Sequence, residues 1–281
     1  KRKSDFKHTD FGRTDLYLEK GYTLLQMDSI LQDLAHHIKS FYLDAKLESF
    51  FESHQKLYDK IEEEVKSSMI SPFLMDTMAH FYGTQPDHIK FEVIPITSLY
   101  SGWGFGSSPI SGDTVTYYQL LSNWADKPIQ NFDSLTLKDD LGFSDSEYNL
   151  EFTIHEFGHS FLDFIRTPEN LKLMSTTEGL SFDNLEAASR YMGYDDEWAV
   201  IFEEHLVRAG EIVILEKFGL TDFTKKKLKD EVQNYKYVYL PIFIEELTKY
   251  DQNRKKYKNL EAYFPNIIER LVEVKKEKFV F

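Results

Sequence analysis

Cysteine is absent from the 281 residues of this chain. Disulfide bonds, thiolate metal ligands and a cysteine nucleophile are therefore excluded, and any metal ion must be held by His, Asp or Glu. Positive charge is also scarce, because 33 Lys and Arg face 47 Asp and Glu, for a formal net charge of -14. Nucleic acid and anionic membranes attract clustered basic residues, so we expect neither as a partner.

Long apolar runs are missing as well. A membrane span needs about 18 consecutive apolar residues, and no stretch of the chain approaches that length, so we expect no membrane span. The chain starts at Lys1 without an initiator Met, which is consistent with an upstream signal peptide that has been removed. We therefore expect an exported protein, periplasmic, at the cell surface or extracellular.

The material for a folded core is plentiful, since 42% of the residues are hydrophobic and the chain contains 23 Phe and 17 Tyr. No internal repeat or low-complexity linker is visible, so we expect a single domain over residues 1–281. Helical periodicity dominates residues 1–88, whereas residues 89–281 begin with β-branched and aromatic runs and then become helical. The fold class that we expect is α+β and mostly helical, with a small sheet.

One segment carries the functional signal. Capping-box spacing of Ser144 and Glu147, and the restriction that Pro168 places on the preceding residue, predict a helix over about 145–166. Its apolar residues at helical spacing form one stripe: Leu150, Ile154, Phe157, Phe161 and Ile165. His155 and His159 lie off this stripe, one turn apart, while Gly158 in the helix interior indicates close approach of another group.

The motif in this helix is H-E-x-x-H, read from "HEFGH". Histidines at i and i+4 can place two ring nitrogens on one Zn²⁺, and a glutamate after the first His faces the water that such an ion would hold. Zinc would lower the pKa of that water toward about 7, and Glu156 would take its proton. We therefore predict His155 and His159 as zinc ligands and Glu156 as the general base of amide hydrolysis.

A third ligand must be a carboxylate, and two places in the sequence offer one. Glu178 follows His159 by 19 positions, as in thermolysin-like gluzincins, but its neighbours are typical of a loop. The other place is the helix predicted for "EWAVIFEEHLVRAGEIVI", which contains Glu203 and Glu204. A second rigid helix holds metal geometry better than a loop, so we choose Glu204, which Arg208 could pair with one turn later.

The segments "HEFGHSF" and "EEHLVRA", followed by "YLPIFIEELTKYDQNRKKYKNLEAYFPNII", make the last two-thirds of the chain similar to a bacterial family. The sequence resembles gluzincin-like proteins that are filed as a domain of unknown function and are common in gut Bacteroidetes. The resemblance implies a zincin-like fold, with an edge strand above the H-E-x-x-H helix. It also implies that Glu204 is the ligand from the second helix and that the protein is exported.

Other parts of an active site are less clearly marked. The segment "DTVTYYQLL" is the candidate for the edge strand that would bind an extended peptide or protein substrate. His205, Arg208, Tyr191 and Tyr194 are candidates for stabilising an oxyanion, of which we select His205 and Arg208. "SGWGFGSS" is expected to be a flap or cleft rim, and Lys225–Lys229 a solvated helix start.

These observations leave three functions to compare. The first is a zinc metallopeptidase that hydrolyses peptide bonds, and the second is a non-catalytic zincin-fold binding or scaffold protein. The third is a zinc hydrolase of a non-peptide amide. Glu156 favours an enzyme, because a scaffold has no chemical need for a general base at this position. Oligomeric state and cleavage specificity are not indicated by the sequence.

Overall fold

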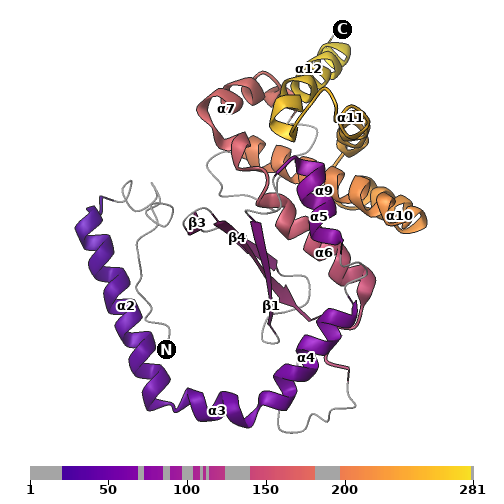
Figure 1. Ribbon diagram of the computed structural model, residues 1–281. Helices are drawn as coiled ribbons and strands as arrows, with labels where there is room; N and C mark the ends of the chain where they lie inside the picture. Colours follow the sequence, from indigo (N-terminus) through magenta and orange to yellow (C-terminus); the bar gives the residue numbers. More distant parts are fainter. Residues whose placement is uncertain are drawn as a thin grey trace.

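The computed structural model describes most of the chain, namely residues 21–68, 73–84, 89–96, 104–107, 110–111, 114–123, 140–180 and 197–279. Two of the candidate oxyanion residues, Tyr191 and Tyr194, lie outside these residues. The described part is mostly helical, with one small mixed sheet, as expected from the sequence (Figure 1).

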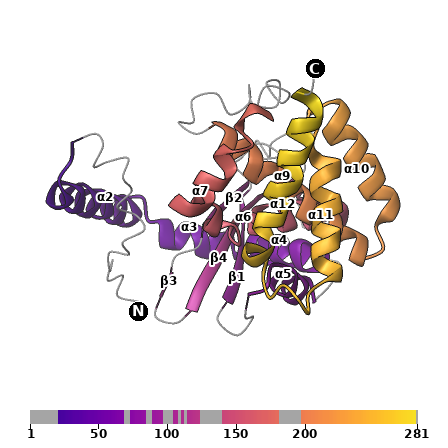
Figure 2. The ribbon, with the colours of Figure 1, turned by 90° about the horizontal axis from the view of Figure 1, so that it is seen from above.

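The N-terminal part is helical, as predicted, and consists of α2 (Leu24–Asp44), α3 (Leu47–Ser53), α4 (Gln55–Ser68) and α5 (Leu74–Tyr82). Thr23 and Gln26 form a capping box at the start of α2. Several apolar residues of α2 are nevertheless exposed to solvent: Leu25 is 79% exposed and Ile38 is 58% exposed. Helix α2 lies apart from the C-terminal helices in both views (Figures 1 and 2).

The sheet contains β1 (Ile89–Ile96), β2 (Gly104–Ser107), β3 (Ile110–Ser111) and β4 (Thr114–Ser122). Strand β4 is paired with β1 in parallel and with β2 and β3 antiparallel. The segment "DTVTYYQLL" was expected to be an edge strand, and this is wrong because β4 has partners on both sides. Strand β2, from the segment expected to be a flap, is an edge of the described sheet.

The helix of the H-E-x-x-H motif is α6 (Ser146–His159), and it contacts β4, β2 and α9. Its N-cap is Asp145, which accepts a hydrogen bond from the backbone N–H of Tyr148, so the capping box predicted from Ser144 is wrong. The helix ends at His159, earlier than predicted, because the chain tightens there into i→i−3 hydrogen bonds,. A 3-10 turn, η4 (Asp163–Arg166), follows. All five residues of the predicted apolar stripe are buried.

The C-terminal part consists of α7 (Pro168–Ser175), α9 (Glu197–Lys217), α10 (Thr221–Gln233), α11 (Leu240–Gln252) and α12 (Leu260–Phe279). Helix α9 occupies the centre, because it contacts α5, α6, α10 and α11. The main hydrophobic core joins residues from α5, the sheet, α6 and these helices, and burial of this apolar area is the main term that stabilises the fold. None of the helices in the described residues is both long and apolar enough to cross a membrane.

Candidate metal centre

Helices α6 and α9 bring His155, His159 and Glu204 together. The Nε2 atom of His155 lies 3.7 Å from Oε2 of Glu204, and Nε2 of His159 lies 3.6 Å from Oε1 of the same carboxylate. One ligand atom from each of the three side chains lies within 4.8 Å of the other two. The sequence prediction that these residues form a group able to hold a metal ion is confirmed.

The donor set suits a divalent ion. Zinc bonds of about 2.0–2.1 Å in tetrahedral geometry place neighbouring ligand atoms about 3.4 Å apart. The distances of 3.7 Å and 3.6 Å between the imidazole nitrogens and Glu204 are close to that spacing. The Nε2 atoms face the shared carboxylate, whereas both Nδ1 atoms face other groups. Each ring is therefore turned so that the nitrogen available to an ion points into the group.

His159 is held by Glu203, the residue directly before the candidate ligand. The Nδ1 atom of His159 lies 3.0 Å from Oε1 of Glu203, and Arg166 donates to Oε2 of Glu203 at 2.6 Å. Burial would lower the pKa of His159, but this contact and the charge of Glu204 raise it above its ordinary value. Glu203 was an alternative third ligand in the sequence analysis. It instead contacts Nδ1 of His159, the ring nitrogen that faces away from the metal group (the outer nitrogen),.

His155 has a second carboxylate at its outer nitrogen. Its Nδ1 atom lies 3.4 Å from Oε2 of Glu211, a fully buried residue on α9. Burial and the positive charge of Arg208 hold the pKa of His155 well below its ordinary value. The ring is therefore neutral near pH 7, which is the form that binds a metal ion. The sequence analysis did not identify Glu211, because its position seven residues after Glu204 is not part of a known spacing.

Arg208 pairs with the candidate ligand, as predicted. Its Nη2 atom lies 3.3 Å from Oε2 of Glu204, and its Nη1 atom donates to Oε1 of Glu231 at 2.5 Å. The guanidinium also lies over the ring of Tyr237, 4.5 Å from its centroid. Burial alone would raise the pKa of Glu204, but His155 and Arg208 hold it below its ordinary value. Arg208 therefore favours the ionised carboxylate that a metal ligand must be.

Lys227 on α10 forms ion pairs with carboxylates next to the metal group. Its Nζ atom lies 2.5 Å from Glu151 on α6, 3.1 Å from Glu211 on α9 and 3.2 Å from Glu231 on its own helix. The charge run around this residue was expected to be solvated, and for Lys227 this is wrong because only 9% of its side chain is exposed. One cation therefore ties α6, α9 and α10 together, and one of its partners, Glu211, also faces His155.

Negative charge is in excess around the metal group. Within the described residues, the carboxylates in this neighbourhood outnumber the cations that pair with them. The carboxylates are Glu151, Glu156, Glu203, Glu204, Glu211 and Glu231, and the cations are Arg166, Arg208 and Lys227. Like charges in a partly buried site repel strongly. Burial raises the pKa of Glu156 and of Glu211 to about 7, so protonation relieves part of this excess, and a divalent cation between the imidazoles and Glu204 would offset more of it.

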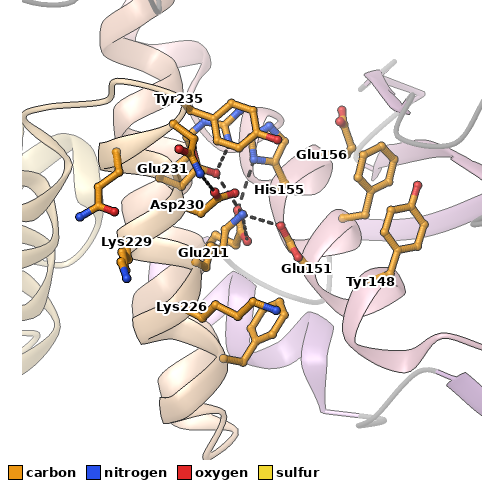
Figure 3. A pocket seen from close by; sticks show the side chains of 16 residues that line it. Tyr148, Glu151, His155, Glu156, Glu211, Lys226, Lys229, Asp230, Glu231 and Tyr235 are labelled. Carbon is orange, nitrogen blue, oxygen red and sulfur yellow. Dashed lines mark hydrogen bonds and ion pairs between the residues drawn. The ribbon is translucent and has the colours of Figure 1, made fainter.

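Glu156 and His155 both line a cavity of about 670 Å³ between α6 and α10 (Figure 3). Burial raises the pKa of Glu156 to about 7, although the neighbouring His159 lowers it. Tyr148 and Phe152 stack on each other on the same side of α6, with ring centroids 5.4 Å apart. The cavity thus combines a carboxylate that can exchange a proton near neutral pH with aromatic walls.

The family model for a domain of unknown function, DUF4932, matches residues 23–270 of the chain. The chain belongs to this family. Neither the curated proteins nor the solved structures contain a match. The matched part of the DUF4932 domain includes both helices of the metal group, together with Lys227 on α10.

Two residues that the sequence analysis considered lie elsewhere in the DUF4932 domain. His205 is fully buried, and its ring packs against Tyr237 and Phe243, with centroids 5.0 Å and 5.2 Å away. Its Nδ1 atom bonds to the carbonyl of Ile201. The choice of His205 as a catalytic residue is therefore not supported, because its side chain faces the core. Glu178 is exposed and is not a member of the metal group.

Gly158 has the close neighbour that the sequence predicted. A Cβ atom at this position would lie 3.1 Å from the hydroxyl oxygen of Tyr82 and 3.3 Å from Cγ1 of Val207. A Cβ at Gly210 on α9 would lie 2.7 Å from the same hydroxyl. The Tyr82 side chain from α5 therefore sits against a glycine on each helix that carries the metal group, and it sets how closely these helices approach.

Proposed function

We propose that this DUF4932 protein is a zinc-dependent metallopeptidase of the gluzincin type. His155, His159 and Glu204 would hold the ion, and Glu156 would act as general base. The observation that carries this proposal is the convergence of the three ligand atoms within 4.8 Å, from two helices, α6 and α9, that are far apart in sequence. We further propose that the protein works outside the cytoplasm, in keeping with the resemblance described above.

Glu156 and Arg208 would have different roles in the proposed hydrolysis. A bound zinc ion would supply a Lewis acid that polarises the substrate carbonyl. Glu156 follows the first ligand, lines the cavity and has a pKa of about 7, so it can accept a proton from water and return it to the leaving amine near neutral pH. Arg208 keeps Glu204 in place through the contact at 3.3 Å. An oxyanion-stabilising role for Arg208, which also lines the cavity, stays a prediction.

The cavity between α6 and α10 is the place that we propose for a substrate side chain. It begins at His155 and Glu156, and half-buried aromatic rings form both walls: Tyr148 and Phe152 on α6 and Phe223 on α10. The buried carboxylates below the cavity are already paired with Lys227 and Arg208. Other polar residues of α10, among them Lys226, Lys229 and Asp230, also line the cavity. The aromatic part of the lining, on the Tyr148 and Phe152 side, favours a large apolar side chain,.

The edge of the sheet gives a second element for substrate binding. Strand β2 contacts α6 and is an edge strand of the described sheet, so its backbone can pair with an extended peptide,. This proposal replaces the sequence-based choice of β4. Peptide addition at β2 and side-chain binding in the aromatic cavity would together fix the scissile bond near Glu156.

The decisive experiment combines metal analysis with a peptide-library cleavage assay. We expect the purified protein to retain one zinc per chain, and wild-type protein to cleave peptides while Glu156→Gln does not, at equal metal content. Absence of bound metal after incubation with zinc would contradict the metal site. Bound metal without cleavage of any peptide would contradict the peptidase and favour the scaffold or the hydrolase of non-peptide amides.

A further inference from the structure

The outer nitrogen of His155 faces a buried carboxylate that lies outside the metal group and outside the proposed chemistry. Glu211 is on α9, two turns after Glu204, and its side chain is 0% exposed. Its Oε2 atom lies 3.4 Å from Nδ1 of His155, and its Oε1 atom lies 3.1 Å from the ammonium of Lys227. One carboxylate therefore spans the distance between a candidate ligand and a cation from another helix.

We propose that Glu211, held by Lys227, is the positioning residue that turns His155 toward the metal. This inference rests on the proposed function for its purpose, but the contacts that carry it do not depend on the activity. Oε2 of Glu211 lies 3.4 Å from Nδ1 of His155 and Lys227 faces the other carboxylate oxygen, so Glu211 is placed to accept a hydrogen bond from an N–H at Nδ1,. With the proton on Nδ1, the Nε2 atom of His155 is left with a free lone pair facing Glu204.

Lys227 explains why Glu211 stays in place. The ammonium of Lys227 pairs with Oε1 of Glu211, and it also lies 2.5 Å from Oε1 of Glu151 and 3.2 Å from Oε1 of Glu231. In Figure 3 the side chains of Glu151 and Glu211 point toward each other from two different helices. The carboxylate therefore cannot rotate away from His155 without leaving a buried ammonium with one fewer partner, which is costly.

The arrangement is repeated at the other ligand with different residues. Glu203 holds Nδ1 of His159 at 3.0 Å and is itself held by Arg166. Outer carboxylates of this kind orient metal-binding imidazoles, and their loss commonly costs about 10–100-fold in metal affinity. Glu203 comes from the segment next to Glu204, but Glu211 depends on α10 for its partner. The metal group is thereby linked to a helix that contributes no ligand.

The test replaces Glu211 by Gln, which is nearly isosteric but can donate through its amide. In metal-free wild-type protein labelled with ¹⁵N-histidine, we expect the His155 signal to show the proton on Nδ1, and in Glu211→Gln we expect the Nε2–H form to appear. The affinity for zinc, measured by competition with a chelator, should fall about 10–100-fold. Lys227 keeps Glu151 and Glu231 in this variant, so the fold should persist.

Two controls separate positioning from a general loss of structure. Glu246 is also a buried glutamate on a helix and is paired with a lysine, Lys249, but it belongs to α11. Glu246→Gln should leave both the His155 signal and the zinc affinity unchanged. Likewise, Lys227→Gln should weaken zinc binding, whereas Lys226→Gln, at the exposed neighbouring position, should not.

The outcomes are distinct. An unchanged His155 tautomer in Glu211→Gln, or a zinc affinity within twofold of that of Glu246→Gln, would overturn the positioning role. A wild-type protein that binds no zinc would refute the metal site, while the tautomer measurement on metal-free protein would still decide the role of Glu211. Zinc binding that depends on Glu211 in a protein without peptidase activity would refute only the proposed function.

Discussion

The contact of Tyr82 with two glycines allows a prediction whose size follows from the distances. Replacement of Gly210 by Ala puts a Cβ 2.7 Å from the Tyr82 hydroxyl, closer than carbon and oxygen can approach without a shift. Overpacking of a core costs about 1–3 kcal/mol, whereas Ala in place of Gly in a helix gains about 1 kcal/mol. We therefore expect Gly210→Ala to lower the free energy of unfolding by about 0–2 kcal/mol.

Removal of the hydroxyl should reverse the sign of this effect. In a Tyr82→Phe background the nearest atoms to the new Cβ are ring carbons at 3.5 Å, an ordinary contact, so Gly210→Ala should then stabilise by about 1 kcal/mol. The hydroxyl has no hydrogen-bond partner in the described part of the chain, so Tyr82→Phe alone should cost little. Urea unfolding of the four proteins measures the coupling, which we expect to be about 1–3 kcal/mol. A coupling near zero would refute the close approach of Tyr82 to α9.

Further predictions concern the site and the core. His155→Ala should abolish zinc binding in a chelator-competition assay, while Glu156→Gln should retain zinc and lose at least about 100-fold in peptide turnover; turnover at the wild-type rate would contradict the general base. Burial lowers the pKa of His205 from 6.5 to about 4. In metal-free protein, the unfolded chain therefore binds more protons than the folded chain between about pH 4 and pH 6.5. Stability should fall by about 3 kcal/mol as the pH drops through that window, and His205→Phe should remove this dependence in urea titrations. Phe152→Ala should raise KM for peptides with large apolar side chains, whereas Phe50→Ala on α3 should not; equal effects would exclude the aromatic cavity as the substrate site.

The sequence predicted those features that depend on neighbours along one helix. His155 and His159 are one turn apart, so the spacing alone places them together, and the apolar period of α9 correctly identified the helix that brings Glu204. Apart from this group, features that depend on pairing between distant segments, such as the strand order and the ion pairs of Lys227, were missed or wrong. The central position of β4 follows from partners that its own pattern does not specify.

The charged residues show the same limit. Lys227 lies in a run of lysines that is typical of a solvated helix, yet three carboxylates from three helices make its burial possible. A short sequence window contains none of the information about Glu151 or Glu211. His205 is the converse case, since this histidine directly follows the candidate ligand Glu204 in sequence but packs against Tyr237 and Phe243 in the core.

A zinc ion at the proposed site would tie the lifetime of the protein to its metal supply, because of the surplus of carboxylates around His155 and His159. A ligand that binds only the folded state, at a free concentration a thousand times its Kd, adds about 4 kcal/mol of stability. Without the ion, only Arg166, Arg208 and Lys227 would offset the repulsion among those side chains, and the metal-free chain would unfold and be digested more often. Where zinc is scarce, the amount of this protein should therefore decline through proteolysis before any change in its synthesis.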